Sequence, residues 1–322
     1  MQYKTFAKSD IKISRLGFGA WGIGKSLWIG AEDSESKKAL RAAIEQGVNF
    51  FDSALVYGMG HSEKLIGEVE KESGQELFIT SKIPSKKMEW PAKADSLLKD
   101  SFPVQHIIDT TERSLRNLKR DHIDLQQFHV WNDKWAGQDE WKEAIYRLKK
   151  EGKVRFFGIS INDHQPANGI EAGKTGLIDS YQVIFNIFDQ SPMDELFPFC
   201  KENSISVIAR VPFDEGSLTG KVTPDTTFPK RDFRNRYFRD DRKEQVWERL
   251  QQIIEVTKTE TENPAEAALR FILSFDEVTS AIPGMRSAEH LLANVQATDK
   301  GALSAELVEK LRDFRWIRNF YE

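Results

Sequence analysis

A chain of 322 residues is long enough for one large α/β domain or two smaller ones around a sizeable hydrophobic core. Its formal net charge of −4, with both signs dispersed along the chain, gives neither the basic patch of a nucleic-acid-binding protein nor an attraction to anionic membranes. A single cysteine, Cys200, excludes an intrachain disulfide, and with no apolar signal core and no membrane-spanning run we expect a cytoplasmic protein that acts on a small molecule.

The chain opens with two short stretches, residues 3–6 and 11–14, whose alternation around a polar turn predicts a β-hairpin. Apolar strand-like runs then alternate with amphipathic helix-like stretches. The strand-like runs are residues 16–19, 48–52, 77–83, 125–129, 156–160, 181–185, 205–211 and 279–284, and the helix-like stretches are residues 33–46, 62–71, 106–118, 138–150 and 193–202. Strands that alternate with helices are typical of a parallel sheet covered by helices.

Eight strand candidates follow the hairpin, and no linker or low-complexity segment divides them. We therefore predict a single domain over residues 1–322 with an α/β fold, a (β/α)8 TIM barrel preceded by an N-terminal β-hairpin. In such a barrel the carboxyl ends of all strands open onto one face, where active sites lie.

Residues 17–22, Gly-Phe-Gly-Ala-Trp-Gly, match the fingerprint of a Rossmann dinucleotide-binding fold and favour a different architecture. That fingerprint requires a helix at its last glycine and an acidic residue about 20 positions later, at the end of the next strand. Here the irregular stretch 23–30 follows, and the next strand candidate lies farther away. The context favours the barrel, since a Rossmann dehydrogenase would require a helix that begins at Gly22.

Four polar residues, Asp52, Tyr57, Lys82 and His129, lie at or just beyond the ends of three predicted strands. In a parallel barrel these ends converge, so the four side chains are expected to meet in one pocket. A carbonyl that is being reduced needs a proton and needs stabilisation of its developing negative oxygen. This set of side chains therefore suits proton donation to a carbonyl.

The segment of residues 222–241 interrupts the alternation and follows the seventh predicted strand, which places it on the same face. Its basic residues are interleaved with aromatic ones: Lys230, Arg231, Arg234, Arg236 and Arg239 with Phe228, Phe233, Tyr237 and Phe238. Two interpretations remain open. The segment is a solvated loop with aromatic anchors, or it is a lid whose cations bind cofactor phosphates or an anionic substrate.

Several segments, in register with the predicted strands, match one known family. They are residues 16–22 (LGFGAWG), 51–58 (FDSALVYG), 79–82 (ITSK), 114–118 (SLRNL), 123–129 (IDLQQFH), 157–160 (FGIS), 181–186 (YQVIFN), 212–221 (PFDEGSLTGK) and 282–286 (IPGMR). Over nearly its whole length the chain resembles the aldo-keto reductases, which are NAD(P)H-dependent carbonyl reductases on a TIM barrel. The resemblance implies that the four polar residues are a catalytic tetrad.

In that tetrad Tyr57 is the proton donor. A nearby ammonium lowers the pKa of a phenol, so Lys82 is expected to lower that of Tyr57. Asp52 would hold Lys82 by a charge-assisted hydrogen bond, and His129 would orient or polarise the substrate carbonyl.

The resemblance further implies that NADPH (NADP⁺) is the cofactor. Ser160 and Gln182 would bind the nicotinamide carboxamide, and residues 212–221 would wrap the pyrophosphate. Arg286 would bind the 2′-phosphate of NADPH by its guanidinium fork. The full set of expected cofactor contacts is Gly19, Ala20, Trp21, Ser160, Gln182, Arg210, Val211, Pro212, Phe213, Gly216, Ser217, Leu218, Gly220, Lys221, Gly284, Met285, Arg286, Ser287, His290 and Asn294.

Two positions near the cofactor depart from the common pattern of the family. Ile161 stands where an asparagine usually follows the serine, so the carboxamide loses one hydrogen bond unless Asn162 replaces it. Ala293 occupies a position that is often acidic, and His290 would have to compensate for it.

A third departure is Arg210, which aligns with the tyrosine that stacks on the nicotinamide in many members of the family. A guanidinium is also planar and can stack. The alternative is that Arg210 turns away and pairs with Asp214.

For the substrate, Trp21 and Trp131 are expected to line the pocket, with Trp28 and Trp90 as further candidates. Aldehydes, ketones and sugars are all compatible with indole faces. No metal site is expected, because no cluster of ligands surrounds His129 and there is no cysteine pair. Either a monomer or a homo-oligomer fits the sequence. The alternative to an enzyme is a regulatory subunit that senses the nicotinamide cofactor with little turnover.

Overall fold

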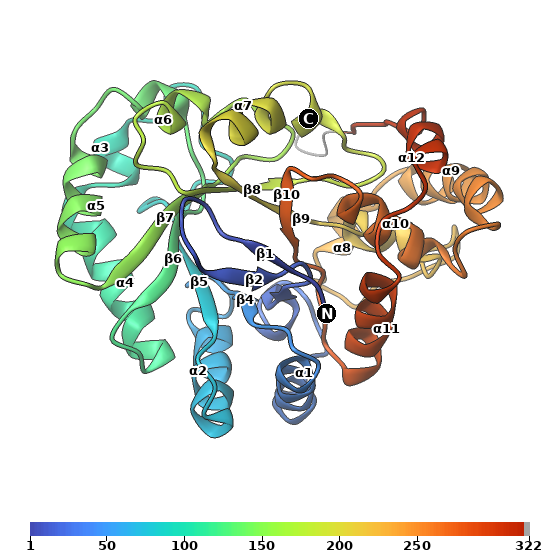
Figure 1. Cartoon of the computed structure of the whole chain (residues 1–322), viewed down its shortest axis with the longest axis horizontal. Coiled ribbons are helices and arrows are strands. Elements are labelled where there is room, and N and C mark those ends of the chain that lie inside the picture. The colour runs from blue at the N-terminus through green and yellow to red at the C-terminus, as the bar shows by residue number, and fades with distance from the viewer. Residues whose placement is uncertain (319–322) are drawn as a thin grey trace.

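The computed structural model describes residues 1–318 and shows a parallel barrel enclosed by helices (Figure 1). Eight strands hydrogen-bond to one another in chain order. They are β3 (Phe18–Gly19), β4 (Phe50–Asp52), β5 (Phe78–Ile83), β6 (Ile123–Phe128), β7 (Val154–Ser160), β8 (Ser180–Ile184), β9 (Ser206–Arg210) and β10 (Val278–Ala281). The predicted (β/α)8 barrel is confirmed. The last four residues of the single domain expected over 1–322 lie outside the described residues.

The first and last strands close the barrel through backbone contacts. The amide of Gly17 donates to the carbonyl of Ala281 at 2.8 Å, and that of Gly19 donates to Pro283 at 3.1 Å. A Cβ atom on Gly19 would lie 2.8 Å from the carbonyl oxygens of Ile282 and Pro283. These glycines thus allow the first and last strands of the barrel to lie close together. No α-helix follows them, because α1 begins at Asp33, and the Rossmann alternative is therefore wrong.

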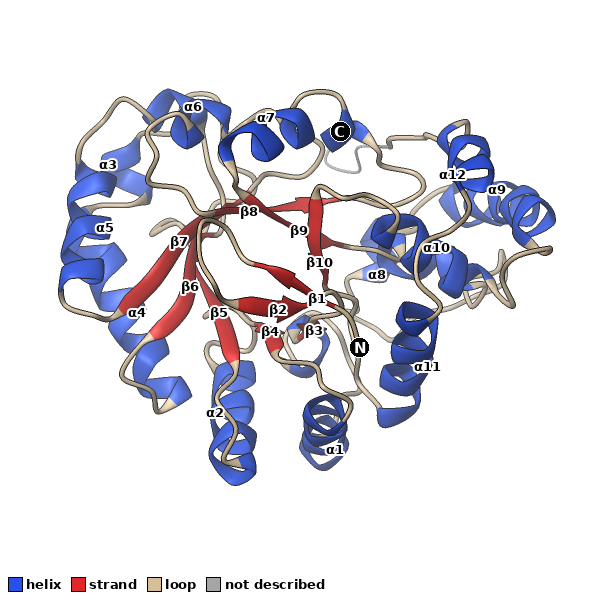
Figure 2. Ribbon diagram, in the orientation of Figure 1, coloured by secondary structure: helices blue, strands red, loops and turns tan. Residues whose placement is uncertain are grey.

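The predicted N-terminal hairpin is also confirmed. Its strands β1 (Tyr3–Thr5) and β2 (Lys12–Ser14) pair antiparallel and cross the centre of the strand ring in Figure 2. Apolar side chains of the hairpin and of the barrel strands and their flanks pack in one buried cluster of Phe6, Ile13, Phe50, Phe78, Leu125, Ile208 and Ile282. The hairpin therefore covers one end of the barrel, and the opposite end carries the strand-end residues.

The helices surround the sheet (Figure 2). They are α1 (Asp33–Glu45), α2 (His61–Ser73), α3 (Leu98–Ser101), α4 (Val104–Leu118), α5 (Glu140–Lys150), α6 (Ile170–Gly173), α7 (Leu196–Asn203), α8 (Arg234–Tyr237), α9 (Arg242–Thr257), α10 (Pro264–Leu273), α11 (Ala288–Asp299) and α12 (Ala305–Arg312). Within residues 1–318, none is both long and apolar enough to cross a membrane.

The helices between β9 and β10 were not predicted from the sequence. Helix α10 is buried from Glu266 to Leu273, so it has no exposed polar face to mark a helical period.

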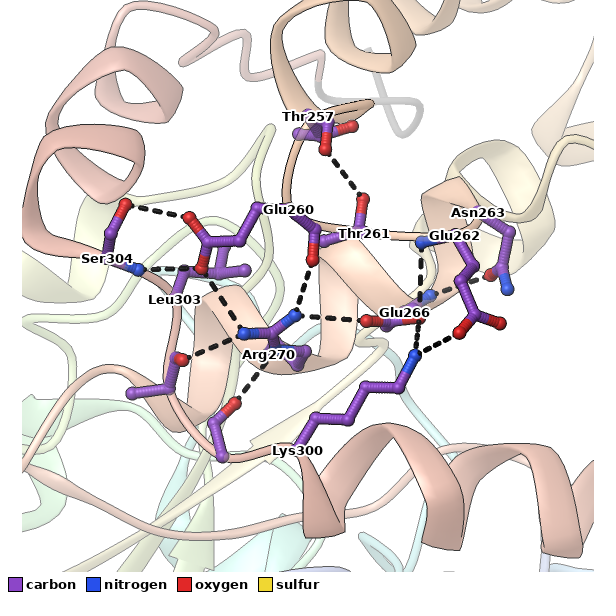
Figure 3. A network of polar contacts seen from close by, with 12 residues as sticks. Thr257, Glu260, Thr261, Glu262, Asn263, Glu266, Arg270, Lys300, Leu303 and Ser304 are labelled. Carbon is purple, nitrogen blue, oxygen red and sulfur yellow. Dashed lines mark hydrogen bonds and ion pairs between the residues drawn. The ribbon is translucent and has the colours of Figure 1, made fainter.

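Arg270 joins α10 to the chain segments before α10 and after α11 (Figure 3). Its guanidinium donates to the carbonyls of Glu260, Gly301 and Ala302 at 2.9, 3.0 and 3.0 Å, and to Glu266 Oε1 at 3.0 Å. The side chain of Arg270 is 8 % exposed and that of Glu266 5 %. Because both charges are nearly buried, each depends on the other for compensation.

Replacing Arg270 by Ala removes the cation and leaves three backbone carbonyls without this donor. We expect the free energy of unfolding to fall by about 3 kcal/mol, the cost of breaking a buried pair. As a control, Arg312→Ala removes an exposed partner of Glu309 on α12 and should change the free energy by less than about 1 kcal/mol. Urea denaturation measures both, and equal losses would mean that the network around Arg270 adds no stability.

Candidate active site

The four strand-end residues lie together at the open end of the barrel. Asp52 ends β4, Lys82 lies on β5, and His129 directly follows β6, where its amide donates to the carbonyl of Ile83 at 2.9 Å. Tyr57 lies in the turn after β4. The barrel thus brings the residues together as the sequence predicted, although their catalytic roles stay a prediction.

Lys82 and Asp52 form a buried ion pair at the centre of this group. Lys82 Nζ lies 2.8 and 2.7 Å from the two carboxylate oxygens of Asp52 and also donates to the carbonyl of Ser53 at 2.7 Å. The side chains are 0 % and 3 % exposed. Gln182, on β8, donates its amide to Asp52 at 2.7 Å, a contact that was not anticipated. The pair therefore joins the ends of three strands.

Tyr57 is held by a turn that depends on the next residue. Its amide donates to the carbonyl of Ala54 at 3.0 Å. Gly58 has a φ of +67°, and a Cβ there would lie 2.1 Å from the carbonyl oxygen of Gly24. Glycine alone tolerates this conformation and this close approach. The turn places Tyr57 Oη 3.5 Å from Lys82 Nζ.

The direction of the pKa shift of Tyr57 differs from the expectation. Burial, followed by the negative charge of Asp52, raises the pKa of Tyr57 well above its ordinary value of 10.0, while Arg210 opposes this. Burial and Asp52 together outweigh the Lys82 ammonium 3.5 Å away, whose charge is matched by Asp52. Tyr57 is therefore a neutral phenol that carries its proton at physiological pH.

His129 faces Tyr57, and their ring centroids are 5.9 Å apart. Burial, followed by the positive charges of Lys82 and Arg210, lowers the pKa of His129 well below its ordinary value of 6.5. The imidazole is consequently neutral at physiological pH. A neutral imidazole can donate one N–H to a substrate oxygen without carrying a charge.

Aromatic side chains surround the mouth of the barrel, but they are not all those expected. Trp21 lies 6.4 Å from the Tyr57 ring, and Trp90 packs its edge against His129 at 4.8 Å between ring centroids. Trp131 is 0 % exposed and packs among the aromatic rings beneath the helices. The expectation that Trp131 lines the pocket is wrong, because its indole belongs to the hydrophobic core.

The segment of residues 222–241 contacts the loop after β3. The amide of Phe233 donates to the carbonyl of Leu27 at 3.0 Å, and the guanidinium of Arg234 lies 4.3 Å from the Trp28 ring centroid. The guanidinium of Arg286, which follows β10, lies 5.4 Å from the centroid of the same indole ring. Aromatic residues thus anchor this segment, and its arginine meets Arg286 around Trp28.

Residues expected to hold a nicotinamide cofactor lie around the same mouth. The buried hydroxyls of Ser160 and Ser217 have no hydrogen-bond partner within residues 1–318, so each retains its capacity to bond a polar ligand. Lys221 Nζ lies 3.4 Å from His290 Nε2, which brings the loop after β9 to α11. These polar groups fit the family's cofactor.

Three of the expected cofactor contacts have side chains in the hydrophobic core. Ala20, Leu218 and Met285 are all 0 % exposed and belong to the hydrophobic core. Their side chains pack behind the residues that face the mouth, and their contacts with a cofactor stay a prediction.

Asn162 does not replace the missing carboxamide contact. Its side-chain amide donates to the carbonyl of Trp131 at 2.9 Å and to Gln165 Oε1 at 3.1 Å, while its oxygen accepts from the amide of Trp131 at 3.2 Å. Asn162 therefore connects two loops. The carboxamide hydrogen bond that an asparagine would supply at position 161 is replaced by neither Ile161 nor Asn162.

Arg210 lies at the end of β9 but does not pair with Asp214 as the alternative required. It donates to Asp163 and, at 2.9 Å, to the carbonyl of Ile161. Asp214 instead accepts from Tyr237 and, at 3.1 Å, from Arg242. The guanidinium stays at the mouth, near enough to affect the pKa values of Tyr57 and His129.

Sequence reasoning missed two acidic residues at this mouth, Asp163 and Glu215. Asp163 lies three residues after the family segment 157–160, and Glu215 lies within the segment 212–221, but neither was expected to contact a ligand. Their place depends on loop conformation, for which the sequence carries no periodic signal. Within residues 1–318, no group of three or more His, Cys, Asp or Glu side chains is placed to hold a metal ion.

Comparison with known proteins agrees with this arrangement. The family model described as the Aldo/keto reductase family matches residues 15–315. The chain is 29 % identical to aldo-keto reductase YhdN of Bacillus subtilis, over 92 % of this chain and 89 % of that protein. It is 27 % identical to aldo-keto reductase yakc [NADP(+)] of Schizosaccharomyces pombe, over 94 % and 88 %, and to the NADH-specific methylglyoxal reductase of Escherichia coli, over 90 % and 91 %.

Solved structures show the same relationship over the whole chain. Aldo-keto reductase AKR11C1 from Bacillus halodurans (holo form) superposes with a TM-score of 0.78 at 26 % identity and 100 % coverage of both chains. The glycerol dehydrogenase AKR11B4 from Gluconobacter oxydans gives a TM-score of 0.80 at 25 % identity, over 97 % of this chain and 94 % of that one. The protein therefore belongs to the aldo/keto reductase family of oxidoreductases, which use nicotinamide cofactors.

Proposed function

We propose that this enzyme reduces an aldehyde or ketone to the alcohol with NADPH, and that Tyr57 donates the proton. The observation that carries the proposal is the position of the Tyr57 hydroxyl, 3.5 Å from the ammonium of a buried Lys82–Asp52 pair, with the Tyr57 ring facing His129 at 5.9 Å between centroids. A bound nicotinamide supplies the hydride.

The residues then have separate tasks. His129 donates an N–H to the carbonyl oxygen and orients it, and Tyr57 transfers its proton to that oxygen as negative charge develops. Lys82 stabilises the tyrosinate that remains, because its ammonium lies beside Tyr57 Oη. Asp52 keeps the ammonium in place.

The alternative function is a cofactor-sensing regulatory subunit. It predicts cofactor binding with little turnover, whereas the enzyme predicts oxidation of NADPH by at least one carbonyl compound. A screen of aldehydes, ketones and sugars, followed by loss of nicotinamide absorbance, separates the two. Binding of NADPH without turnover of any class would favour the sensor.

Replacing Tyr57 by Phe removes the proton donor but keeps the ring. We expect turnover to fall about a hundredfold or more, with the affinity for NADPH nearly unchanged. Tyr146→Phe, on α5 with 61 % exposure, is the matched control and should keep full turnover. Retention of most of the activity in the Tyr57 variant would exclude Tyr57 as the donor.

The neutral state of His129 predicts a simple pH dependence. Its pKa lies well below 6.5, so no proton is gained by the imidazole as the pH passes through that value. With saturating cofactor, the single-turnover rate measured by stopped flow should therefore stay constant between about pH 5.5 and about pH 7.5. A loss of rate centred near pH 6.5 in wild type, absent from His129→Asn, would show that His129 titrates normally.

The proposed preference for NADPH depends on Arg286. Its guanidinium is half-buried, and its pKa is lowered by burial and then by Arg234, which indicates two cations close together. A charge-assisted contact contributes about 1.5 to 3 kcal/mol, so Arg286→Ala should weaken NADPH binding about tenfold or more and barely change NADH binding. The exposed Arg116 on α4 provides the control, Arg116→Ala. Equal losses for the two cofactors would assign Arg286 a structural role.

A further inference from the structure

Glu215 is a partly exposed carboxyl group at the mouth of the barrel that the proposed mechanism does not use. It lies in the short helix η4 (Asp214–Thr219), within the loop expected to wrap the cofactor pyrophosphate. Among the contacts within residues 1–318, none joins its carboxylate to a hydrogen-bond donor or a cation at ion-pair distance. A carboxylate in this state is available to a ligand.

The backbone around Glu215 is strained. Val211, Asp214 and Glu215 have φ values of 56°, 46° and 56°, in the left-handed region that side chains other than glycine rarely adopt. Each such residue is in an unfavourable backbone conformation, which persists where neighbouring contacts enforce it.

Contacts from outside the loop enforce this conformation. The carboxylate of Asp214 accepts from Tyr237 Oη and, at 3.1 Å, from Arg242 Nη2, and all three side chains are buried. Asn186 donates to the carbonyl of Val211 at 2.9 Å. Contacts with the rest of the fold thus hold this turn in an unfavourable backbone conformation and keep Glu215 at the mouth of the barrel.

The charged and titratable groups around Glu215 come from four parts of the chain. They are Tyr57 after β4, Asp163 after β7, Arg210 on β9 with Asp214 after it, and Arg234 with Tyr237 on α8. Both arginines already have a carboxylate partner, Asp163 for Arg210 and Asp232 for Arg234. Burial, followed by the charges of Asp214 and Asp163, raises the pKa of Glu215 to about 8.

We propose that Glu215 is a further cofactor-binding residue, which contacts the bound nicotinamide dinucleotide in its uncharged form, so that cofactor binding takes up a proton. The proposal rests on the proposed function, because it requires the cofactor diphosphate at this loop. An ionised carboxylate repels the diphosphate, whereas a protonated one removes that repulsion and can donate a hydrogen bond to it.

The proposal predicts the direction of the pH dependence. At neutral pH Glu215 is already protonated and binding is independent of pH. Above about pH 8 the free protein has lost this proton, and binding must restore it. One linked proton lowers the affinity about tenfold for each pH unit in that range.

The test is to measure the dissociation constants of NADH and NADPH by quenching of tryptophan fluorescence at pH 7.0, 8.5 and 9.5. NADH has no 2′-phosphate, so titration of that group does not enter its result. Wild type should lose affinity about tenfold between the two alkaline values, and Glu215→Gln should lose none. Glu140→Gln, an exposed change on α5, should behave as wild type. Calorimetry in two buffers of different ionisation enthalpy should show proton uptake at pH 9 in wild type and Glu140→Gln but none in Glu215→Gln.

Parallel losses of affinity in wild type and Glu215→Gln, or an affinity that rises with pH, would overturn the proposal. If Glu215→Gln does not fold, Glu215→Ala replaces it and should likewise show no alkaline loss. Failure of wild type to bind either cofactor at any pH would instead overturn the proposed function and this inference with it. Binding with turnover but without a Glu215-dependent slope overturns this inference alone.

Discussion

The buried ion pair of Lys82 and Asp52 is the constraint on which the candidate site depends. Two charges with 0 % and 3 % exposed side chains each cost several kcal/mol to remove from water, and only close geometry offsets that cost. Here Lys82 reaches both carboxylate oxygens, and Gln182 donates to the same group. Burial and then the negative charge of Asp52 raise the pKa of Tyr57, so that the phenol keeps its proton. The Lys82 ammonium lies 3.5 Å from Tyr57 Oη, where it would stabilise the anion left by the proposed proton transfer.

The geometry of the barrel makes this pair possible. Closure between the first and last strands passes through Gly17 and Gly19, and at Gly19 the carbonyl oxygens of Ile282 and Pro283 approach too closely for a Cβ atom. The hairpin and its buried cluster cover one end, so polar groups at the other end face a single mouth. Convergence of strand ends from distant parts of the sequence then places a cation, a carboxylate and an imidazole within one small space.

Charge at the mouth is largely balanced before any ligand binds. Three arginines each lie against a carboxylate, in the pairs Arg210–Asp163, Arg234–Asp232 and Arg242–Asp214. Arg286 donates to a backbone carbonyl, and Glu215 has a raised pKa. Apart from Lys221, the net charge that a dinucleotide meets therefore depends on these last two groups. One attracts phosphate at all relevant pH values, and the other repels it only when ionised.

The sequence by itself determined the barrel, the hairpin and the meeting of Asp52, Tyr57, Lys82 and His129, because apolar runs mark strands and parallel strands have a common carboxyl end. It did not determine α10, whose burial on all sides hides the helical period. Only the tertiary structure decided that Trp131 points into the core, that Tyr57 is not acidified, and that Glu215 stays at the mouth. These properties depend on burial and on contacts between residues far apart in the chain, and neither is encoded in local sequence spacing.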